Sequence, residues 1–186
     1  LLLTVTLVWA LNRSWDLSSL GIDNPIPPLG KFLDPFHGFW ANAELKASPD
    51  QQLNLPGLKG EVSVVYDSLL IPHLFAENDD DLYRVMGYVT AQHRLWQMEF
   101  QTHAAAGRVS EIIGDVALDF DRNQRRKGMV FAAENSAKAH SKDSIVSKVY
   151  RQYTEGVNAY ISSLSYGDYP IEYKLLDYEP ELWNDL

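Results

Sequence analysis

The five histidines come first, because imidazole serves both as a metal ligand and as an acid or base near neutral pH. They are His37, His73, His93, His103 and His140. No H-E-x-x-H motif is present, and no two histidines have metal-ligand spacing. Glu99 and His103 are four residues apart, which predicts a pair on a helix surface in preference to half of a metal site.

Nucleophiles and phosphate-binding loops give no stronger signal. The chain contains no cysteine, which excludes disulfides, thiolate metal sites and a cysteine nucleophile. No G-x-S-x-G elbow and no glycine-rich phosphate loop are present. Ser110, between Val109 and Glu111, suits the start of a helix.

Carboxylates occur in pairs, but basic residues lie beside them. Asp119 and Asp121 are followed by three arginines between positions 122 and 126, so we expect local ion pairs in preference to acid–base catalysis. We expect Asp67 to form a turn. These side chains alone predict an α+β domain with two long helices and assign no catalytic residue.

Composition excludes one class of partner. The chain has 186 residues, of which 46% are hydrophobic and 22% charged, as in folded domains. Its net charge is −9, whereas nucleic-acid binders need a positive surface. We therefore expect no nucleic-acid partner.

Residues 1–23 are expected to form an apolar tail and a linker. Residues 1–11 (LLLTVTLVWAL) are too few to cross a bilayer, which takes about 20, but they fit the end of a signal sequence or membrane anchor. No small-residue cleavage site follows, which favours an uncleaved anchor and membrane attachment through residues 1–11. The alternative is a buried strand or short core helix. Because the first residue is not Met, we expect the sequence to begin within a longer reading frame.

Residues 24–60 are rich in proline and glycine and predict an extended wrapping segment. Its aromatic residues are too apolar for a free linker, so we expect part of it to pack on the body. They are Phe32, Phe36, Phe39 and Trp40.

The folded body is expected to start at Glu61 with a β-hairpin. Residues 61–66 and 69–76 have the β-branched and apolar content of strands, and Asp67-Ser68 supplies the turn. Pro72 cannot donate a backbone hydrogen bond, so its strand should lie at an edge or a bulge.

Helices should follow the hairpin. Residues 78–81 (NDDD) suit the start of a helix of about 28 residues that Gly107 ends. Its apolar face, from Leu82 to Phe100, should be exposed when the rest of a larger protein is missing. Further along, the pattern predicts a helical turn at 109–114, a charged loop at 115–128 and helices at 129–140 and 143–166. Residues 169–183 are aromatic and contain proline, which suits packing across other elements.

Several motifs after Glu61 stand in a fixed order. They are V-Y-D at 65–67, I-P-H-L-F-A at 71–76, G-Y-V-T-A-Q-H-R-L-W-Q-M-E at 87–99, G-R-V-S-E-I-I-G at 107–114, then Asp121, Arg125 and Gly128, and Y-E-P-E-L-W at 178–183. Together they resemble the penicillin-acylase family of amidohydrolases, which are N-terminal-nucleophile hydrolases. Residues 61–186 would be a partial penicillin-acylase-like domain, incomplete at its C-terminus. His93 departs from the family, which usually has Asp there.

The resemblance implies an α+β fold. The chain would be the mostly helical α-chain portion of an αββα hydrolase, with its N-terminal β-hairpin contributing to the sheet. In this family a precursor is cut into an α and a β chain, and the new N-terminal Ser of the β chain attacks the amide. Accordingly the resemblance assigns no catalytic, cofactor-binding or metal-binding residue to this sequence, and its partner would be its own β chain.

The resemblance also implies a small N-acyl substrate, such as a β-lactam side chain, or an acyl-homoserine lactone as an alternative within the family. No organic cofactor is expected. Calcium is expected in the complete protein, with no ligand assignable here. A periplasmic or other extracytoplasmic place follows, with a membrane anchor. A different class of function, a membrane-tethered helical scaffold without catalysis, would explain the helices but not the ordered motifs.

Overall fold

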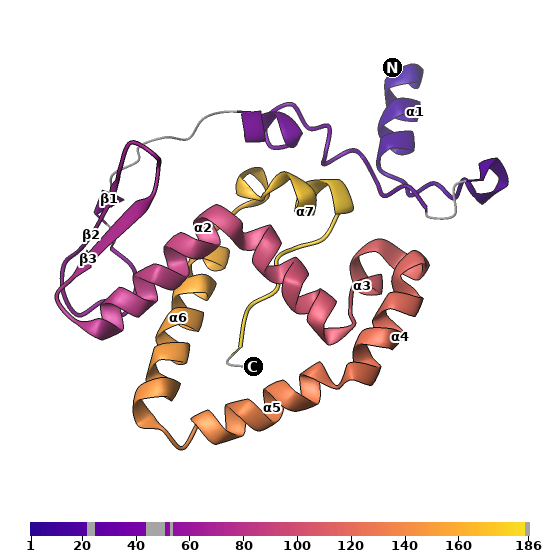
Figure 1. The fold of residues 1–186 in the computed structure, drawn as a ribbon. Helices are drawn as coiled ribbons and strands as arrows, with labels where there is room; N and C mark the ends of the chain where they lie inside the picture. The colour runs from indigo at the N-terminus through magenta and orange to yellow at the C-terminus, as the bar shows by residue number, and fades with distance from the viewer. Residues whose placement is uncertain (22–24, 44–50, 53, 185–186) are drawn as a thin grey trace. The chain divides into compact units, whose positions relative to one another are not determined.

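The computed structural model describes residues 1–21, 25–43, 51–52 and 54–184 (Figure 1). They divide into two compact units. Unit 1 comprises residues 1–45, 99–127 and 164–180, and unit 2 comprises residues 46–98, 128–163 and 181–186. The α+β prediction is confirmed, because helices dominate and one small antiparallel sheet is present.

The sheet lies in unit 2 and has the strand order β1-β2-β3. Its strands are β1 (Gln51–Gln52), β2 (Val62–Tyr66) and β3 (Pro72–Ala76). β2 and β3 form the predicted hairpin, with Val62 opposite Ala76 and Tyr66 opposite Pro72. Among the described residues β3 has one strand neighbour, so Pro72 lies on an edge strand as expected.

Side-chain alternation gives the hairpin an inner and an outer face. Val62 and Val64 are 1% exposed and pack with Val85 and Val89 of α2 (Asp79–Ala106). The predicted exposed apolar face on α2 is therefore wrong over this stretch, because the hairpin covers it. Exposed apolar side chains occupy the outer face and the turn of the hairpin instead. They are Val65, Leu69, Leu70, Ile71 and Phe75.

Asp67 forms the expected turn between β2 and β3. Its carboxylate accepts hydrogen bonds from the backbone N–H groups of Leu69 and Ile71, at 2.8 and 2.9 Å. The bond from Ile71 is the main reason that the pKa of Asp67 lies below its usual range. Leu70 has a φ of 59°, which is unusual for a branched apolar residue.

The long helix α2 begins and ends where the sequence predicts. Asn78 accepts the backbone N–H of Asp81 at 3.0 Å, and Gly107, with a φ of 68°, follows the last turn. The sequence did not predict the interruption at Arg94, whose φ and ψ are −143° and 21°.

In unit 2, α2 approaches α6 (Ser144–Ser163) through two glycines. A Cβ atom on Gly87 would lie 2.1 Å from the carbonyl oxygen of Tyr153, and one on Gly156 would lie 1.9 Å from that of Arg84. The helix predicted at residues 129–140 is also confirmed, as α5 (Met129–His140).

Unit 1 contains two helices that the sequence analysis did not predict. Residues 118–127 were expected to be part of a charged loop but form α4 (Leu118–Lys127) after α3 (Ser110–Ile113) and the 3-10 turn η3 (Gly114–Ala117). Acidic residues in the first turn and basic residues in the last turn of α4 favour the helix dipole. The aromatic segment contains η4 (Tyr166–Asp168) and α7 (Ile171–Leu176).

Part of the wrapping segment packs on unit 1, as predicted. The rings of Phe32 and Phe39 stack at 5.1 Å, and η2 (Phe39–Ala43) contacts α7. The parts of the predicted segment at positions 24, 44–50 and 53 lie outside the described residues.

The chain begins with α1 (Leu2–Leu11), and η1 (Ser18–Leu20) follows. α1 has no buried residue, so the alternative of a buried strand or core helix is wrong. Within the described ranges, no helix combines the length and the hydropathy that crossing a membrane requires.

Candidate functional site

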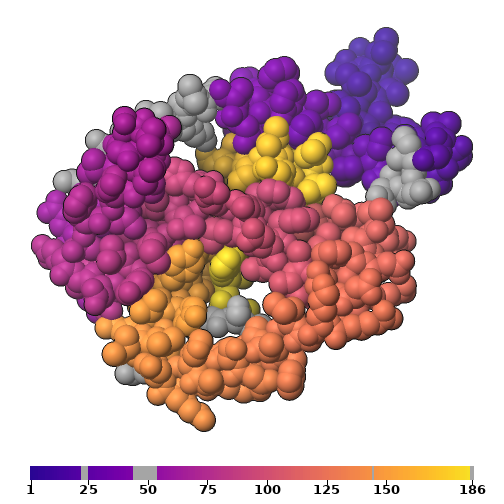
Figure 2. All heavy atoms as spheres, in the orientation of Figure 1, coloured from indigo at the N-terminus to yellow at the C-terminus, as the bar shows by residue number. Residues whose placement is uncertain are grey.

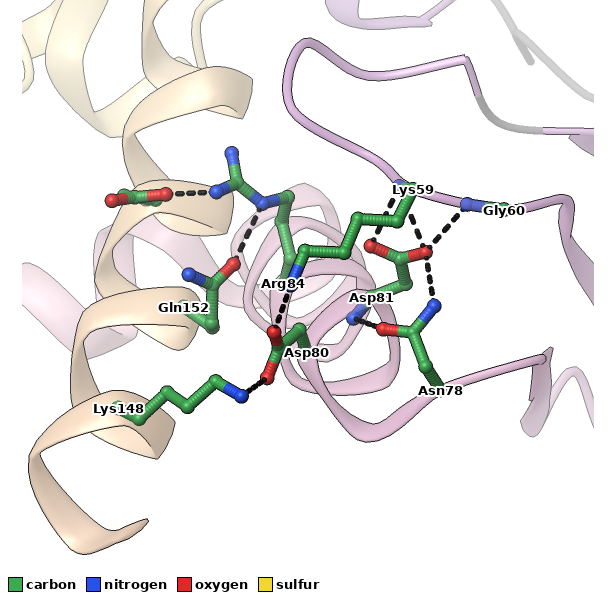
Figure 3. A network of polar contacts seen from close by, with 9 residues as sticks. Lys59, Gly60, Asn78, Asp80, Asp81, Arg84, Lys148 and Gln152 are labelled. Carbon is green, nitrogen blue, oxygen red and sulfur yellow. Dashed lines mark hydrogen bonds and ion pairs between the residues drawn. The ribbon is translucent and has the colours of Figure 1, made fainter. Parts of the chain in front are cut away.

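The start of α2 carries the densest polar network of unit 2 (Figure 3). Asp80 accepts hydrogen bonds from the ammonium groups of Lys148, at 2.6 Å, and Lys59. These two bonds, that from Lys148 first, hold the pKa of Asp80 below its usual range. Because Lys59 precedes β2 and Lys148 lies on α6, one carboxylate connects three segments.

The Asp81 carboxylate accepts hydrogen bonds mainly from backbone N–H groups, unlike that of Asp80, which binds ammonium groups. Its side chain is nearly inaccessible, at 1% relative exposure. It accepts the N–H groups of Lys59, at 3.0 Å, and Gly60, at 2.9 Å, and the amide of Asn78 at 2.7 Å (Figure 3). Burial alone would raise the pKa of Asp81, but these hydrogen bonds outweigh it and the pKa is lowered.

Arg84 completes this network one helical turn later. Its Nε donates to Gln152 at 3.0 Å, its guanidinium pairs with Glu155, and Nη1 donates to the carbonyl of Pro56 at 2.8 Å. The planar guanidinium thereby joins α2, α6 and the segment before the hairpin. Neither lysine, nor Arg84, could be placed here from sequence spacing.

In unit 1, Asp121 has a similar role. Its carboxylate accepts the N–H groups of Val109 and Ser110 at 2.9 and 2.7 Å, and the Ser110 hydroxyl at 2.5 Å. Burial would raise its pKa, but these hydrogen bonds lower it. Arg125 donates to the carbonyl of Gly107 at 2.8 Å. Asp121 and Arg125 therefore fix both ends of one short loop.

This arrangement changes one expectation and confirms another. Asp121 was expected in an ion-pair network but binds the start of α3, and Asp119 alone of the pair contacts Arg122, at 3.2 Å on the exposed surface. Ser110 starts a helix as predicted. Its hydroxyl donates to the Asp121 carboxylate, which also accepts two backbone N–H groups, so this contact fixes the start of α3 and gives no sign of an activated nucleophile.

Glu99 and His103 were predicted to form a pair on the helix surface. Both side chains are instead buried, at 1% and 3% exposure. His103 Nδ1 lies 3.0 Å from the backbone carbonyl oxygen of Glu99. The Glu99 carboxylate accepts the hydroxyl of Tyr173 at 2.7 Å. Burial, and then this bond, raise the pKa of Tyr173.

Lys174 is buried at 1% exposure although it stands in an aromatic segment. Its ammonium donates to the carbonyl oxygens of Gly38 at 2.9 Å and Gly167 at 3.1 Å, and to Asn42 Oδ1 at 2.7 Å. It thus holds η2 and η4 against α7. A single lysine among aromatic residues was the only sequence signal for this role.

Two further histidines contact side chains of the hairpin. His93 Nε2 lies 2.8 Å from the hydroxyl of Tyr66 on β2, so the residue that departs from the resembled family connects α2 to the hairpin. His73 Nε2 lies 3.4 Å from the turn carboxylate of Asp67.

The family model described as penicillin amidase matches residues 61–186. The chain belongs to the penicillin amidase family. It is 40% identical over 131 residues to the penicillin acylase 2 proenzyme of Pseudomonas sp. (strain SE83), covering 70% of this chain and 16% of that protein. It is 32% identical over 130 residues to the acyl-homoserine lactone acylase QuiP of Pseudomonas fluorescens Pf-5, covering 69% and 16%.

A solved structure of a thermostable penicillin G acylase from Alcaligenes faecalis matches with a TM-score of 0.60 and 30% identity, covering 68% of this chain and 67% of that chain. The chain spans about 16% of the length of these two curated relatives.

In this penicillin amidase family member, several residues of the ordered motifs support the backbone. Asp67 forms the turn of the hairpin, and Gly87 allows the backbone of α6 to approach α2 closely. Asp121 and Arg125 hold the loop at 107–110. The prediction that no catalytic residue lies in this sequence stays a prediction.

Calcium takes six to eight oxygen ligands, so a candidate carboxylate needs lone pairs that face a common point. Asp80, Asp81 and Asp121 are each engaged by ammonium, backbone or hydroxyl donors. These three carboxylates do not fit the calcium ion that the resemblance implies, and that ion stays an expectation for a complete protein.

Proposed function

We propose that this chain is the N-terminal part of an amidase precursor that hydrolyses the N-acyl bond of a small molecule. The observation that carries the proposal is the family match over residues 61–186, with relatives named penicillin acylase and acyl-homoserine lactone acylase. Since the chain spans about 16% of the length of those relatives, we assign the reacting groups to the rest of the precursor.

The reaction would use an N-terminal Ser freed by cleavage of the precursor. Its hydroxyl oxygen attacks the amide carbon while its own α-amino group takes the proton. Hydrogen-bond donors stabilise the tetrahedral oxyanion, the amine leaves with the proton, and an ester to the acyl group remains. Water then attacks the ester and releases the acid. In this scheme the residues described above hold the scaffold.

For the substrate, the greater identity to the penicillin acylase 2 proenzyme favours a β-lactam side chain or a related N-acyl compound. The second candidate is an acyl-homoserine lactone, because relatives named acyl-homoserine lactone acylase are 32–33% identical over 130 residues. Both substrates present a secondary amide, so one nucleophile serves either. The scaffold alternative gains no support, because it leaves the family match unexplained.

The decisive experiment compares this 186-residue chain with its reading frame extended past Leu186. We expect the extended product to be cleaved before a Ser, Cys or Thr and to release amine from phenylacetyl and fatty-acyl amides. Replacing that residue by Ala should abolish cleavage and turnover. Turnover by the 186-residue chain alone would overturn the placement of the nucleophile. A stop codon soon after Leu186 would support the scaffold.

The exposed apolar side chains on the outer face of the hairpin suit contact with another segment of the same precursor. Phe75 and Val65 are 59% and 41% exposed on neighbouring strands, and Leu69 at the turn is 77% exposed. Most of a relative's length lies outside the matched part, so we assign this surface to the remaining precursor or its β chain.

A substitution pair tests this surface. Val65→Asp with Phe75→Asp, made in the extended reading frame, should lower the yield of cleaved enzyme while the 186-residue chain keeps its melting temperature. Phe131→Asp on α5, where the side chain is 71% exposed, is the matched control and should mature normally. Normal maturation of the double variant would show that the surface has no partner in the precursor.

A further inference from the structure

α1 presents large apolar side chains on every side. No charged residue occurs from Leu1 to Leu11, and none of the residues of α1 is buried. Figure 2 shows its atoms, in indigo, uncovered from this viewpoint. The large apolar side chains among residues 1–9 are each more than half exposed. They are Leu1, Leu2, Leu3, Val5, Leu7, Val8 and Trp9.

The distribution of apolar side chains around α1 indicates whether a protein groove or a lipid phase surrounds it. A helix that docks in a protein groove has one apolar face and one polar face. Successive residues of a helix point about 100° apart, so the apolar residues from Leu1 to Trp9 reach every side, and Thr4 and Thr6 are the polar residues among them. The hydroxyl of Thr6 donates to the carbonyl of Leu2 at 2.9 Å, which satisfies it within the helix. A lipid phase can surround such a helix, whereas a groove covers one side.

The C-terminal end of α1 has different chemistry. Trp9 and Trp15 pack edge to face with centroids 6.1 Å apart, and the Arg13 guanidinium carbon lies 5.2 Å from the Trp9 centroid. Trp15 Nε1 donates to the carbonyl of Ala10 at 2.9 Å, so the chain folds back beside the helix end. Tryptophan and arginine together are characteristic of the boundary between lipid and water.

Charge complementarity identifies the group at that boundary. Arg13 is the first charged side chain of the sequence, and it is positive. A guanidinium can form paired hydrogen bonds with a phosphate while its stem stays in apolar surroundings. Lipid headgroups present phosphates at the depth where the tryptophan rings would lie.

We propose that α1 inserts into one leaflet of a lipid bilayer, with Trp9, Arg13 and Trp15 at the level of the lipid phosphates. The ten residues of α1 extend about 15 Å at 1.5 Å per residue, about half of a hydrocarbon core of roughly 30 Å.

Vesicle flotation with the whole 186-residue chain tests the proposal. We expect the chain to float with vesicles of phosphatidylcholine containing some phosphatidylglycerol. Leu3→Lys with Leu7→Lys should lower the partition coefficient by about 100-fold or more, because moving a lysine into hydrocarbon is strongly unfavourable. Leu20→Lys with Phe36→Lys changes two residues that are 74% and 80% exposed outside α1, and this control should float as the wild type does.

Depth and charge give two further measurements. Lipids brominated near the headgroup should quench tryptophan fluorescence more than lipids brominated near the chain ends, and this difference should disappear in the Trp9→Phe, Trp15→Phe variant. Arg13→Gln should reduce the preference for anionic vesicles.

Three outcomes would overturn the inference. They are wild-type chain that stays with the aqueous phase, equal binding by the Leu3→Lys, Leu7→Lys variant, or self-association without lipid that this variant abolishes. The last result would identify a second copy as the occupant. None of these measurements depends on amidase activity. Because α1 has no buried residue, its substitutions should leave the melting temperature unchanged.

Discussion

Replacing Gly156 by Ala places a methyl group where α2 and α6 meet backbone to backbone. The new Cβ would lie 1.9 Å from the carbonyl oxygen of Arg84 and 3.0 Å from the backbone nitrogen of Tyr88. A flexible side chain could turn away from the methyl group, but backbone atoms inside a helix cannot. The two helices would therefore have to separate.

The expected loss of stability can be worked out from this geometry. Ala is more favourable than Gly inside a helix by about 1 kcal/mol, so helix propensity alone would make the variant more stable. Moving the carbonyl from 1.9 to an ordinary 3.4 Å separates the helices by about 1.5 Å, which forfeits much of the dispersion energy across the contact. Overpacking costs about 1–3 kcal/mol, and the lost contacts add to it. We expect a net loss of about 2–4 kcal/mol, or roughly 4–15 °C in Tm.

Urea unfolding followed by circular dichroism measures this change, and hydrogen exchange in α2 and α6 localises it. Ser136→Ala, on the exposed side of α5, is the control and should change the free energy of unfolding by less than about 0.5 kcal/mol. Gly87→Ala should destabilise similarly, and the double variant should lose less than the sum because one separation relieves both contacts. A Gly156→Ala variant as stable as the wild type would refute the close approach.

Three further substitutions test the networks and the turn. Asp81→Asn should lower the free energy of unfolding at pH 7 by about 1–3 kcal/mol. Because the folded-state pKa of Asp81 is lowered, its contribution is complete above the unfolded pKa and disappears as pH falls through the folded pKa. Wild-type urea midpoints should thus decline more steeply at acid pH than those of the variant, and parallel curves would contradict this. Lys174→Met should cost about 1–3 kcal/mol and speed hydrogen exchange at 38–42, so unchanged exchange there would argue against the anchoring role. Leu70→Asn should raise the free energy of unfolding by about 0.5–1 kcal/mol, and with it the Tm, because Asn tolerates a φ of 59° better than Leu does. A lower Tm would show that the turn is not strained.

Sequence reasoning succeeded where a local rule determines the structure. Asn78 predicts the start of α2, and Asp67 predicts the turn, because both side chains accept backbone N–H groups from residues three or four positions later. The ordered motifs identified the family, which the comparisons confirm.

Prediction failed where partners meet only after folding. Asp81 binds Lys59 and Gly60 more than 20 residues away, and Asp80 binds Lys148 on another helix. α4 was missed because few of its residues are apolar, so its helix depends on charge placement rather than on an apolar stripe. Lys174 was missed because a charged residue is rarely buried, and its neutral acceptors come from distant segments.

Within the part of the chain that the structure describes, one side of β3 has no strand partner, and this bears on how such a protein is synthesised. A strand with free backbone groups beside exposed apolar residues is a template for another strand, including one from a second copy. Ribosomes add about 5–20 residues per second, and N-terminal segments fold first. In a precursor several times as long as this chain, the hairpin would be complete for roughly tens of seconds before its covering segment is made. The yield of mature enzyme would then depend on elongation rate and on chaperones that shield the strand during that interval.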